Sequence, residues 1–430
     1  MRFVSTRAGA GPAGLSGAIA QGLASDGGLF VAERLPGVSP DALPDAGDLP
    51  ALAAALVAPF AEGDPLAVQL DEVCREAFNF PAPLVRLDRA RGDARVLELF
   101  HGPTCAFKDF GARFMAAALA RILGPRSRPA TILVATSGDT GGAVAAAFHR
   151  RPGIEVVLLY PKGLVSDRQA QQLACWGDNV RTFAVHGTFD ECQRMVKEAF
   201  RDPVLSRARD LSSANSINIG RLLPQMVYYA SASLDVWRRD GRKAGFIVPS
   251  GNLGNVTACV WARELGLPID EIVLATNANQ VVTDFLDGGD WRPHPSVATL
   301  ASAMDVGNPS NMERLRALFP DHLRERVSAR RVTDDEIRAT IREDAVSLGY
   351  TWDPHGATAA RVYHQLADDR RDRPWVLVET AHPAKFNEIV EPLVGREIPV
   401  PPALARLLSL PRQEEDLDPT LDALRTALGS

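Results

Sequence analysis

Several familiar signatures are missing from this sequence of 430 residues. It has no dense block of lysine and arginine and a net charge of −6, so the charge pattern of a nucleic-acid-binding protein is absent. No uninterrupted run of about 18 apolar residues occurs, and the first residues lack the apolar core of an export signal. We therefore expect a cytoplasmic protein that neither spans a membrane nor binds nucleic acid.

Cysteine is also scarce. The five cysteines are scattered, without the paired spacing of a disulfide framework or a zinc site, which favours a reducing compartment and predicts no metal. Hydrophobic residues make up 46% and charged residues 23%, as in an ordinary globular protein. The length allows about two to three domains.

The chain changes character near residue 95. Before it, short amphipathic stretches rich in alanine, proline and aspartate predict an N-terminal extension. After it, apolar runs alternate with helical segments, as in βαβ units with a mainly parallel sheet. The expected strands are Thr131–Ala135, Ile154–Tyr160, Val180–Val185, Gly245–Val248, Glu271–Ala275 and Trp375–Glu379. Helices are expected at about 109–122, 140–150, 167–176, 189–200, 220–238 and 256–266. Thr188 and Glu191 have the spacing of a capping box.

Two strand-to-helix junctions resemble each other, TILVAT-SGDTGG and FIVP-SGNLGN. Neither has the glycine spacing of a Rossmann fingerprint or the ending of a P-loop. Small residues still let the backbone approach a ligand, and free N–H groups at a helix start favour phosphate or carboxylate. The two loops therefore predict two anion sites, one for a cofactor and one for a substrate.

Lys108 lies between Phe107 and Phe110, after a Gly-Pro turn and before a helical stretch. Desolvation by the two rings would lower its pKa, which an amine needs if it is to attack an aldehyde. By local sequence alone, Lys108 can equally be a helix-start lysine with its head in solvent. In the same way, SGNLGN at 250–255 can be an ordinary turn, and Thr380 can be a residue that merely ends a strand.

Seven segments, taken together, favour the functional interpretation of Lys108, the loop at 250–255 and Thr380. They are FHGPTCAFKDFG, ATSGDTGG, NSINIGR, VPSGNLGN, ATNANQVV, DPHGATA and ETAHPAKF. Their order and spacing resemble those of the threonine synthase family, pyridoxal-phosphate enzymes of the tryptophan-synthase-β fold type. The resemblance covers about nine-tenths of the chain. It implies an α/β protein of fold type II, with two open twisted domains, the cofactor in the cleft between them, and an N-terminal extension. The expected boundaries are 1–95 for the extension, 96–111 and 215–395 for a large domain, 112–214 for a small inserted domain and 396–430 for a C-terminal tail.

The resemblance also implies which residues hold pyridoxal 5'-phosphate. Lys108 occupies the position of the Schiff-base lysine, and Thr380 that of the hydroxyl residue facing the pyridine nitrogen. The cofactor phosphate falls on Gly251, Asn252, Leu253, Gly254 and Asn255. Relatives often carry Phe and Asp in place of Leu253 and Asn255, a mild departure for a loop that works through backbone donors.

The implied substrate is O-phospho-L-homoserine, which needs one site for a carboxylate and one for a phosphate. The carboxylate falls on the first loop, at Thr136, Ser137, Gly138, Asp139 and Thr140. The phosphate falls on Ser216, Asn218 and Arg221, although without the resemblance Arg221 reads as a solvated helix residue. An aspartate beside the phenolic oxygen of the cofactor would repel it, so Asp139 is assigned to the site without a named contact.

The reaction implied is γ-elimination of phosphate followed by addition of water at the β-carbon, with Lys108 as base for the α-proton. A phospho-lyase that stops at elimination and releases 2-oxobutyrate would share nearly every motif. A relative acting on serine would not need the NSINIGR segment. A non-enzymatic binding module would not need Lys108, the glycine loop and Thr380 together.

Overall fold

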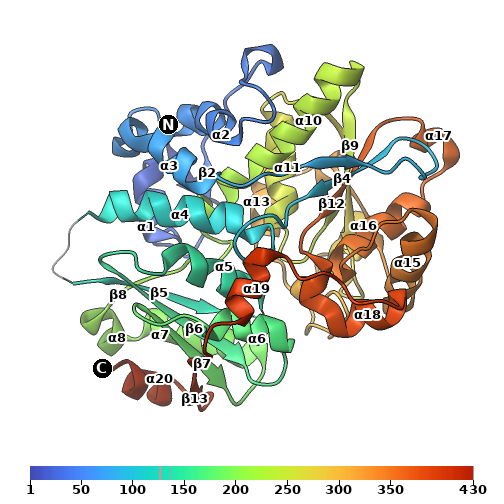
Figure 1. Cartoon of the computed structure of the whole chain (residues 1–430). Helices are drawn as coiled ribbons and strands as arrows, with labels where there is room; N and C mark the ends of the chain where they lie inside the picture. The colour runs from blue at the N-terminus through green and yellow to red at the C-terminus, as the bar shows by residue number, and fades with distance from the viewer. Residues whose placement is uncertain (125–127, 137, 430) are drawn as a thin grey trace.

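Two open β-sheets lie side by side and carry helices on their faces (Figure 1). The structure is a computed structural model that describes residues 1–124, 128–136 and 138–429. The larger sheet has the order β11-β10-β9-β12-β4-β3 and is parallel except for the antiparallel edge strand β3. Its strands are β3 (Leu84–Arg86), β4 (Ala94–Glu98), β9 (Ala244–Pro249), β10 (Ile269–Thr276), β11 (Ser328–Arg331) and β12 (Trp375–Glu379).

The smaller sheet has the order β13-β7-β6-β5-β8 and is parallel throughout. Its strands are β5 (Ala130–Ala135), β6 (Ile154–Pro161), β7 (Val180–Val185), β8 (Asp210–Ser212) and β13 (Glu415–Leu417). A third, two-stranded sheet pairs β1 (Phe3–Ser5) with β2 (Phe30–Ala32). The α/β class predicted from alternating apolar runs and helical segments is confirmed.

All six expected strands form, because each is an apolar run that is buried in a parallel sheet. The predicted capping box is also confirmed, since the Thr188 hydroxyl accepts from the Glu191 amide at 3.3 Å and the Glu191 carboxylate accepts from the Thr188 amide at 2.7 Å. The helices of the smaller sheet are α5 (Asp139–Phe148), α6 (Asp167–Ala174), α7 (Phe189–Arg201) and α8 (Pro203–Ala208).

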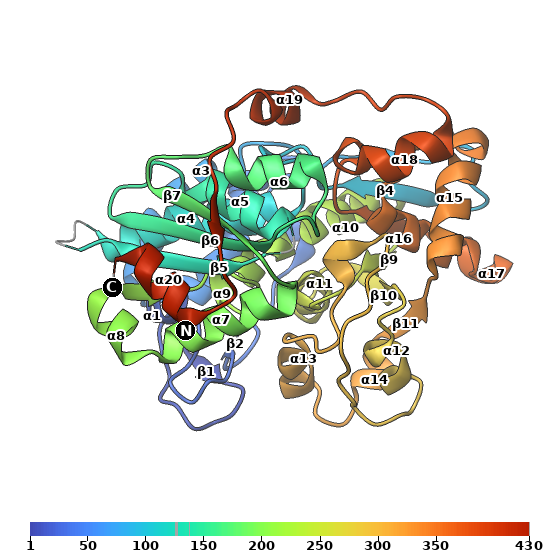
Figure 2. The same ribbon diagram turned by 90° about the horizontal axis from the view of Figure 1, so that it is seen from below.

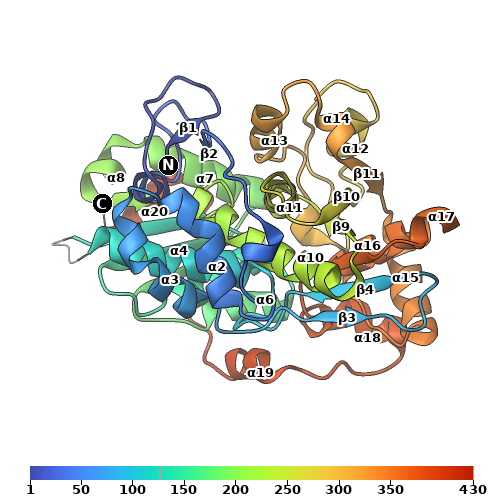
Figure 3. The same cartoon turned by 90° about the horizontal axis from the view of Figure 1, so that it is seen from above.

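The remaining helices cover the larger sheet and the N-terminal part. The N-terminal helices α1 (Leu15–Gln21), α2 (Leu49–Val57) and α3 (Leu70–Ala77) lie beside α4 (Lys108–Leu123) and α10 (Met226–Asp240) (Figure 3). The others are α9 (Ile219–Leu222), α11 (Gly254–Glu264), α12 (Val281–Leu286), α13 (Met312–Leu318), α14 (Leu323–Arg326), α15 (Asp334–Ser347), α16 (Pro354–His364), α17 (Asp368–Arg371) and α18 (Asn387–Val394). Among the described residues, no helix has both the length and the apolar character needed to cross a membrane.

Several elements differ from the sequence-based expectation, among them a divided helix and a strand of the larger sheet. The single helix expected at 220–238 is divided into α9, a 3-10 turn and α10, because Pro224 lacks the amide hydrogen that a continuous helix needs. Strand β4 was not predicted, because Arg95 interrupts its apolar pattern. The Arg95 side chain is nevertheless buried, with ion pairs to Asp93 and Asp240.

The C-terminal segment links the two sheets. After α18 the chain passes across the molecule through α19 (Pro402–Leu408), as Figure 2 shows, and then adds β13 beside β7. The last helix, α20 (Leu421–Leu428), packs on α7. The segment expected to be a tail therefore contributes an edge strand, which its acidic sequence did not predict. The domain boundaries given above stay a prediction.

Candidate active site

The segment before Lys108 is held against the segment that follows β12. The amide of Phe107 donates to the carbonyl of Thr380 at 2.8 Å, and the amide of His382 donates to the carbonyl of Cys105 at 3.0 Å. Ala106 and Ala381 form the antiparallel bridge between these two bonds. Cys105 has a left-handed backbone, φ 56°, a conformation that is unfavourable for a side-chain-bearing residue and is found preferentially at functional sites.

Lys108 is the first residue of α4 and keeps part of its side chain accessible. Burial lowers the pKa of its amine to about 8. The charge of Asp139 opposes this lowering, and the charges of Lys385 and Arg221 add to it. The ammonium lies 5.5 Å from the centroid of the Phe107 ring, whereas Phe110 turns into the core and packs on Phe80 with ring centroids 4.5 Å apart. The direction of the pKa shift predicted from the sequence is confirmed.

The SGNLGN loop joins β9 to α11. Leu253 is left-handed, φ 61°, and thereby turns the chain so that the next residues begin the helix. A Cβ at Gly251 would lie 2.6 Å from the Cα of Met304, so this glycine lets two backbones come into close contact. The hydroxyls of Tyr228 and Tyr229 donate to Oδ1 of Asn255 at 2.6 and 2.7 Å. Its Nδ2 is buried without a partner among the described residues.

Asn252 is fixed from three sides. Its Nδ2 donates to the hydroxyl of Ser216 at 2.7 Å, and its Oδ1 accepts from the amide of Ser310 at 2.6 Å. The side chain of Asn311 donates to the carbonyl of Asn252 at 2.9 Å. The NSINIGR segment and the glycine loop are therefore neighbours, as a joint cofactor and substrate site requires.

Arg221 is buried, which excludes the solvated helix residue that its local sequence allowed. Its Nη1 donates to the carbonyl of Ala214 at 2.5 Å, and its Nε has no partner among the described residues. Burial lowers the pKa of the guanidinium to about 10, so it stays charged at neutral pH. A Cβ at Gly111 would meet Arg221 Nε at 3.1 Å, which places the guanidinium against α4 one turn after Lys108.

Asn218 has a different setting. Its Nδ2 donates to the carbonyls of Ile19 and Ser213 at 2.9 and 3.2 Å, and its Oδ1 caps α9 at the amide of Gly220. These contacts fit a residue that shapes the segment. Its predicted contact with the substrate phosphate stays a prediction.

The first loop follows β5 and leads into α5. The hydroxyl of Thr136 accepts from the amides of Gly138 and Gly141 at 3.1 and 2.9 Å, and Gly138 caps the helix with φ 137°. Thr140 lies in the first turn of α5. Ser137 lies outside the described residues. The loop places a helix start beside the site, where a carboxylate is favoured.

Asp139 has a partner that local sequence did not reveal. Its Oδ1 lies 2.8 Å from the Nζ of Lys385 and accepts from Nε2 of Gln169 at 3.2 Å. Burial alone would raise the pKa of this carboxyl, but the charges of Lys385 and Lys108 lower it well below its usual range. Asp139 is therefore ionised, and its charge is neutralised within the site.

Thr380 directly follows β12, at the edge where the neighbouring parallel strand β9 also ends. Its side chain is buried, and its carbonyl is used by Phe107. No hydrogen bond from another described residue to its hydroxyl is present, so the hydroxyl is available to a ligand. Ligands of open parallel sheets bind at this end of the strands.

Pyridoxal phosphate fits this arrangement. Lys108 offers an amine with a lowered pKa, Gly251 lets the SGNLGN loop lie against the backbone of Met304, and Asn255 offers a buried donor with no partner among the described residues in the first turn of α11. These features with the two parallel sheets define a pyridoxal-phosphate-dependent enzyme of fold type II. A family model described as pyridoxal-phosphate dependent enzyme matches residues 76–380. Models of the N terminus and of the C-terminal part of threonine synthase match residues 2–78 and 356–428. The chain belongs to the threonine synthase family.

Individual relatives agree with this assignment. A threonine synthase of Haemophilus influenzae is 42% identical over 96% of this chain and 96% of its own, and one of Serratia marcescens is 46% identical over 82% of this chain and 81% of its own. The crystal structure of threonine synthase from Escherichia coli superposes with a TM-score of 0.90 at 40% identity, covering 100% of this chain and 99% of that one. A threonine synthase from Brucella melitensis with bound pyridoxal phosphate has the same TM-score at 34% identity, covering 100% and 98%.

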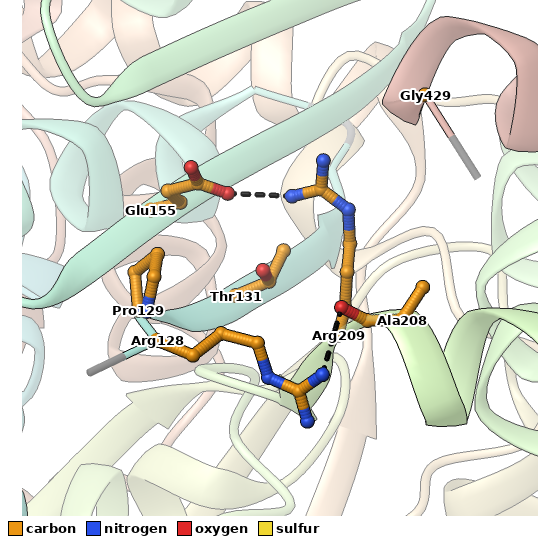
Figure 4. Close-up of a pocket in the computed structure, with 7 residues that line it drawn as sticks. All are labelled: Arg128, Pro129, Thr131, Glu155, Ala208, Arg209 and Gly429. Carbon is orange, nitrogen blue, oxygen red and sulfur yellow. Dashed lines mark hydrogen bonds and ion pairs between the residues drawn. The ribbon is translucent and has the colours of Figure 1, made fainter. Parts of the chain in front are cut away.

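A hollow elsewhere on the smaller sheet contains none of the predicted site residues. It is lined by Arg128, Pro129, Thr131, Glu155, Ala208, Arg209 and Gly429 (Figure 4). Arg209 pairs with Glu155 at 2.5 Å, and Arg128 donates to the carbonyl of Ala208 at 3.2 Å. Its arginines are already engaged within the protein, so it is not the active site.

Sequence reasoning missed three residues near the site. Lys385 lies in the quoted segment ETAHPAKF, and Asp353 and His355 lie in DPHGATA, but none was given a role. The His355 ring pairs with Asp353 at 2.5 Å and accepts from the amide of Ala303 at 3.1 Å. Met304, which follows Ala303, packs against Gly251. The pair of His355 and Asp353 therefore helps to hold the backbone on which the glycine loop rests.

Proposed function

We propose that the chain converts O-phospho-L-homoserine and water to L-threonine and phosphate. Its small-molecule substrate needs a base for the α-proton, a carboxylate site and a phosphate site, and the candidate residues lie around Lys108. The observation that carries the proposal is the amine of Lys108. This amine has a lowered pKa, and Lys108 begins α4 directly after Phe107, whose amide donates to the carbonyl of Thr380.

When bound, pyridoxal phosphate supplies an electron sink for the charge left when a C–H bond at the α-carbon breaks. The Nζ of Lys108 accepts the α-proton, because a pKa of about 8 leaves part of the amine unprotonated near neutral pH. The hydroxyl of Thr380 would face the pyridine nitrogen and, unlike a carboxylate, would not hold a proton on it, which would favour elimination and replacement over transamination.

The substrate ends are bound by two further elements. The first turn of α5, which begins at Asp139 and Thr140, offers amide donors to the α-carboxylate. Thr136 and Gly138 shape the loop before it, because the Gly138 amide donates to the Thr136 hydroxyl. Arg221 and Ser216 bind the γ-phosphate, and the buried guanidinium stabilises the charge of phosphate as it leaves. Loss of a proton from the β-carbon accompanies the departure of phosphate from the γ-carbon. The γ-carbon is then protonated, and water adds at the β-carbon.

We place the reaction in the cytoplasm, in keeping with five cysteines that are all free and buried. The test is incubation of the purified protein with O-phospho-L-homoserine while phosphate, threonine and 2-oxobutyrate are quantified. Equal molar yields of phosphate and threonine are expected. Phosphate with 2-oxobutyrate in place of threonine would identify a phospho-lyase and contradict the proposal.

A further inference from the structure

Lys385 is a charged side chain with no exposed surface. It belongs to the 3-10 turn η6 (Pro383–Phe386), which follows β12. Its Nζ donates to the carbonyl of Thr104 at 2.8 Å and lies 2.8 Å from Oδ1 of Asp139. Taking an ammonium out of water costs several kcal/mol unless it is paired and hydrogen-bonded. Such a group beside a reactive lysine therefore calls for a function.

Lys385 connects parts of the site that come from both sheets. Thr104 belongs to the segment that leads to Lys108, and Asp139 begins α5 of the smaller sheet. The neighbouring residues strengthen the junction: Arg168 of α6 donates to the carbonyl of Ala384, and the hydroxyl of Ser166 donates to the carbonyl of Lys385 at 3.4 Å. The ammonium is thus held at one place between the two sheets.

The charge of Asp139 acts on Lys108, and the charge of Lys385 acts on it in the opposite direction. The charged groups that influence Lys108 are Asp139 from α5, Lys385 from η6, Arg221 from α9 and Asp353 at the start of α16. Asp139 is in turn influenced by Lys385, Lys108 and His355. Lys385 also acts on Asp109 and Cys105, the other titratable groups of the segment around Lys108. Of these groups, Asp139 is the one that pairs directly with Lys385.

We propose that Lys385 is a positioning residue for the reaction: it holds the carboxylate of Asp139 in an ion pair and opposes the effect of that charge on Lys108. The amine of Lys108 is then free to join the cofactor and to accept the α-proton, while the carboxylate does not face the phenolic oxygen of the cofactor. This inference rests on the proposed function in that Lys108 carries the cofactor.

The test compares Lys385→Met, Asp139→Asn and the double variant in the pyridoxal-phosphate-loaded protein. The first readout is the pH midpoint of the visible absorption, which reports protonation of the nitrogen that joins Lys108 to the cofactor. Lys385→Met leaves an unpaired carboxylate and should raise the midpoint by about 1 pH unit or more. Asp139→Asn should lower it, and the double variant should return close to the parent because neither charge remains.

The second readout is kcat/KM at about pH 7 and about pH 9. In Lys385→Met, the factor by which kcat/KM falls relative to the parent should be at least about fivefold smaller at the higher pH. The proton on the nitrogen of Lys108 is removed more easily there. Lys162→Met is the matched control, since Lys162 is an exposed lysine paired with Asp416 at 2.6 Å, and it should change neither readout. If Lys385→Met does not fold, Asp139→Asn still provides a test. The proposal predicts that the pH midpoint of its visible absorption lies below that of the parent, and an unchanged or raised midpoint would contradict it.

A common midpoint in parent and variants, with the same loss at both pH values, would overturn the inference and leave Lys385 with a packing role only. So would a double variant no closer to the parent than Lys385→Met. The absorption readout does not depend on which product forms. A protein that makes 2-oxobutyrate but shows the predicted shifts would contradict the proposed function and support this inference.

Discussion

The amide of Phe107 donates to the carbonyl of Thr380 at 2.8 Å, so the residue before Lys108 is joined to the residue that directly follows β12. The two candidate cofactor contacts are thereby fixed relative to each other by backbone atoms, which side-chain motion does not disturb. An amine placed in this way does not have to search for the cofactor ring, and geometry of this kind lowers the entropic barrier of a reaction.

The first prediction concerns the pH dependence of cofactor capture. When pyridoxal phosphate is added to protein stripped of cofactor, the initial rate of the absorbance change should rise about tenfold per pH unit and level off above about pH 8, because the unprotonated amine of Lys108 is the attacking form. Stopped-flow absorbance over a pH series measures this. A rate that keeps rising towards about pH 10.4, the value of an ordinary lysine, would show that burial does not act on this amine.

The second prediction concerns Arg221→Met, which keeps most of the volume and removes the charged fork. We expect kcat/KM for O-phospho-L-homoserine to fall by at least about 100-fold, since a buried arginine binds a phosphate through two parallel hydrogen bonds. The visible absorption of bound cofactor should stay near that of the parent, and thermal denaturation checks the fold. Equal losses of cofactor and activity would mean that Arg221 serves the cofactor and not the substrate.

The third prediction concerns Gly251→Ala. The added Cβ would lie 2.6 Å from backbone of Met304, so the loop must move and affinity for pyridoxal phosphate should fall by about tenfold or more. Equilibrium dialysis of the cofactor measures the effect. Gly17→Ala is the control, because the nearest atom to its new Cβ is 3.5 Å away and the residue lies within α1. Unchanged cofactor affinity in Gly251→Ala would remove this loop from the site.

The fourth prediction concerns Asn255, whose Oδ1 accepts from two buried tyrosines. Asn255→Ala leaves both hydroxyls without this acceptor and should lower the free energy of unfolding by about 2 to 4 kcal/mol. Asn255→Asp keeps the acceptor and should stay within about 1 kcal/mol of the parent. Chemical denaturation followed by fluorescence gives both values. Similar stability of the alanine variant and the parent would show that the two hydrogen bonds contribute little.

Much of the framework could be predicted because its signal is local. The six expected strands are apolar runs buried in parallel sheets, and the capping box at Thr188 is a contact between residues three apart. Patterns of this kind need no knowledge of distant segments.

The rest depends on contacts between distant segments. Strand β4 contains Arg95, whose charge is neutralised by Asp240 from α10, and β13 is an acidic segment that becomes a strand only beside β7. The pair of Lys385 with Asp139 joins the end of one sheet to the start of a helix on the other. No local pattern carries such information, so Asp139 could be assigned to the site but its contact could not be named.

The central claim is that Lys108 bears the cofactor, and one measurement tests it directly. The holoprotein is reduced with borohydride, digested and analysed by mass spectrometry to locate the phosphopyridoxyl group, which reduction fixes to the lysine that held it. The label is expected on the peptide that contains Lys108, while Lys385, the other buried lysine of the site, stays unmodified. A label on Lys385, or on a lysine elsewhere in the chain, would contradict the claim.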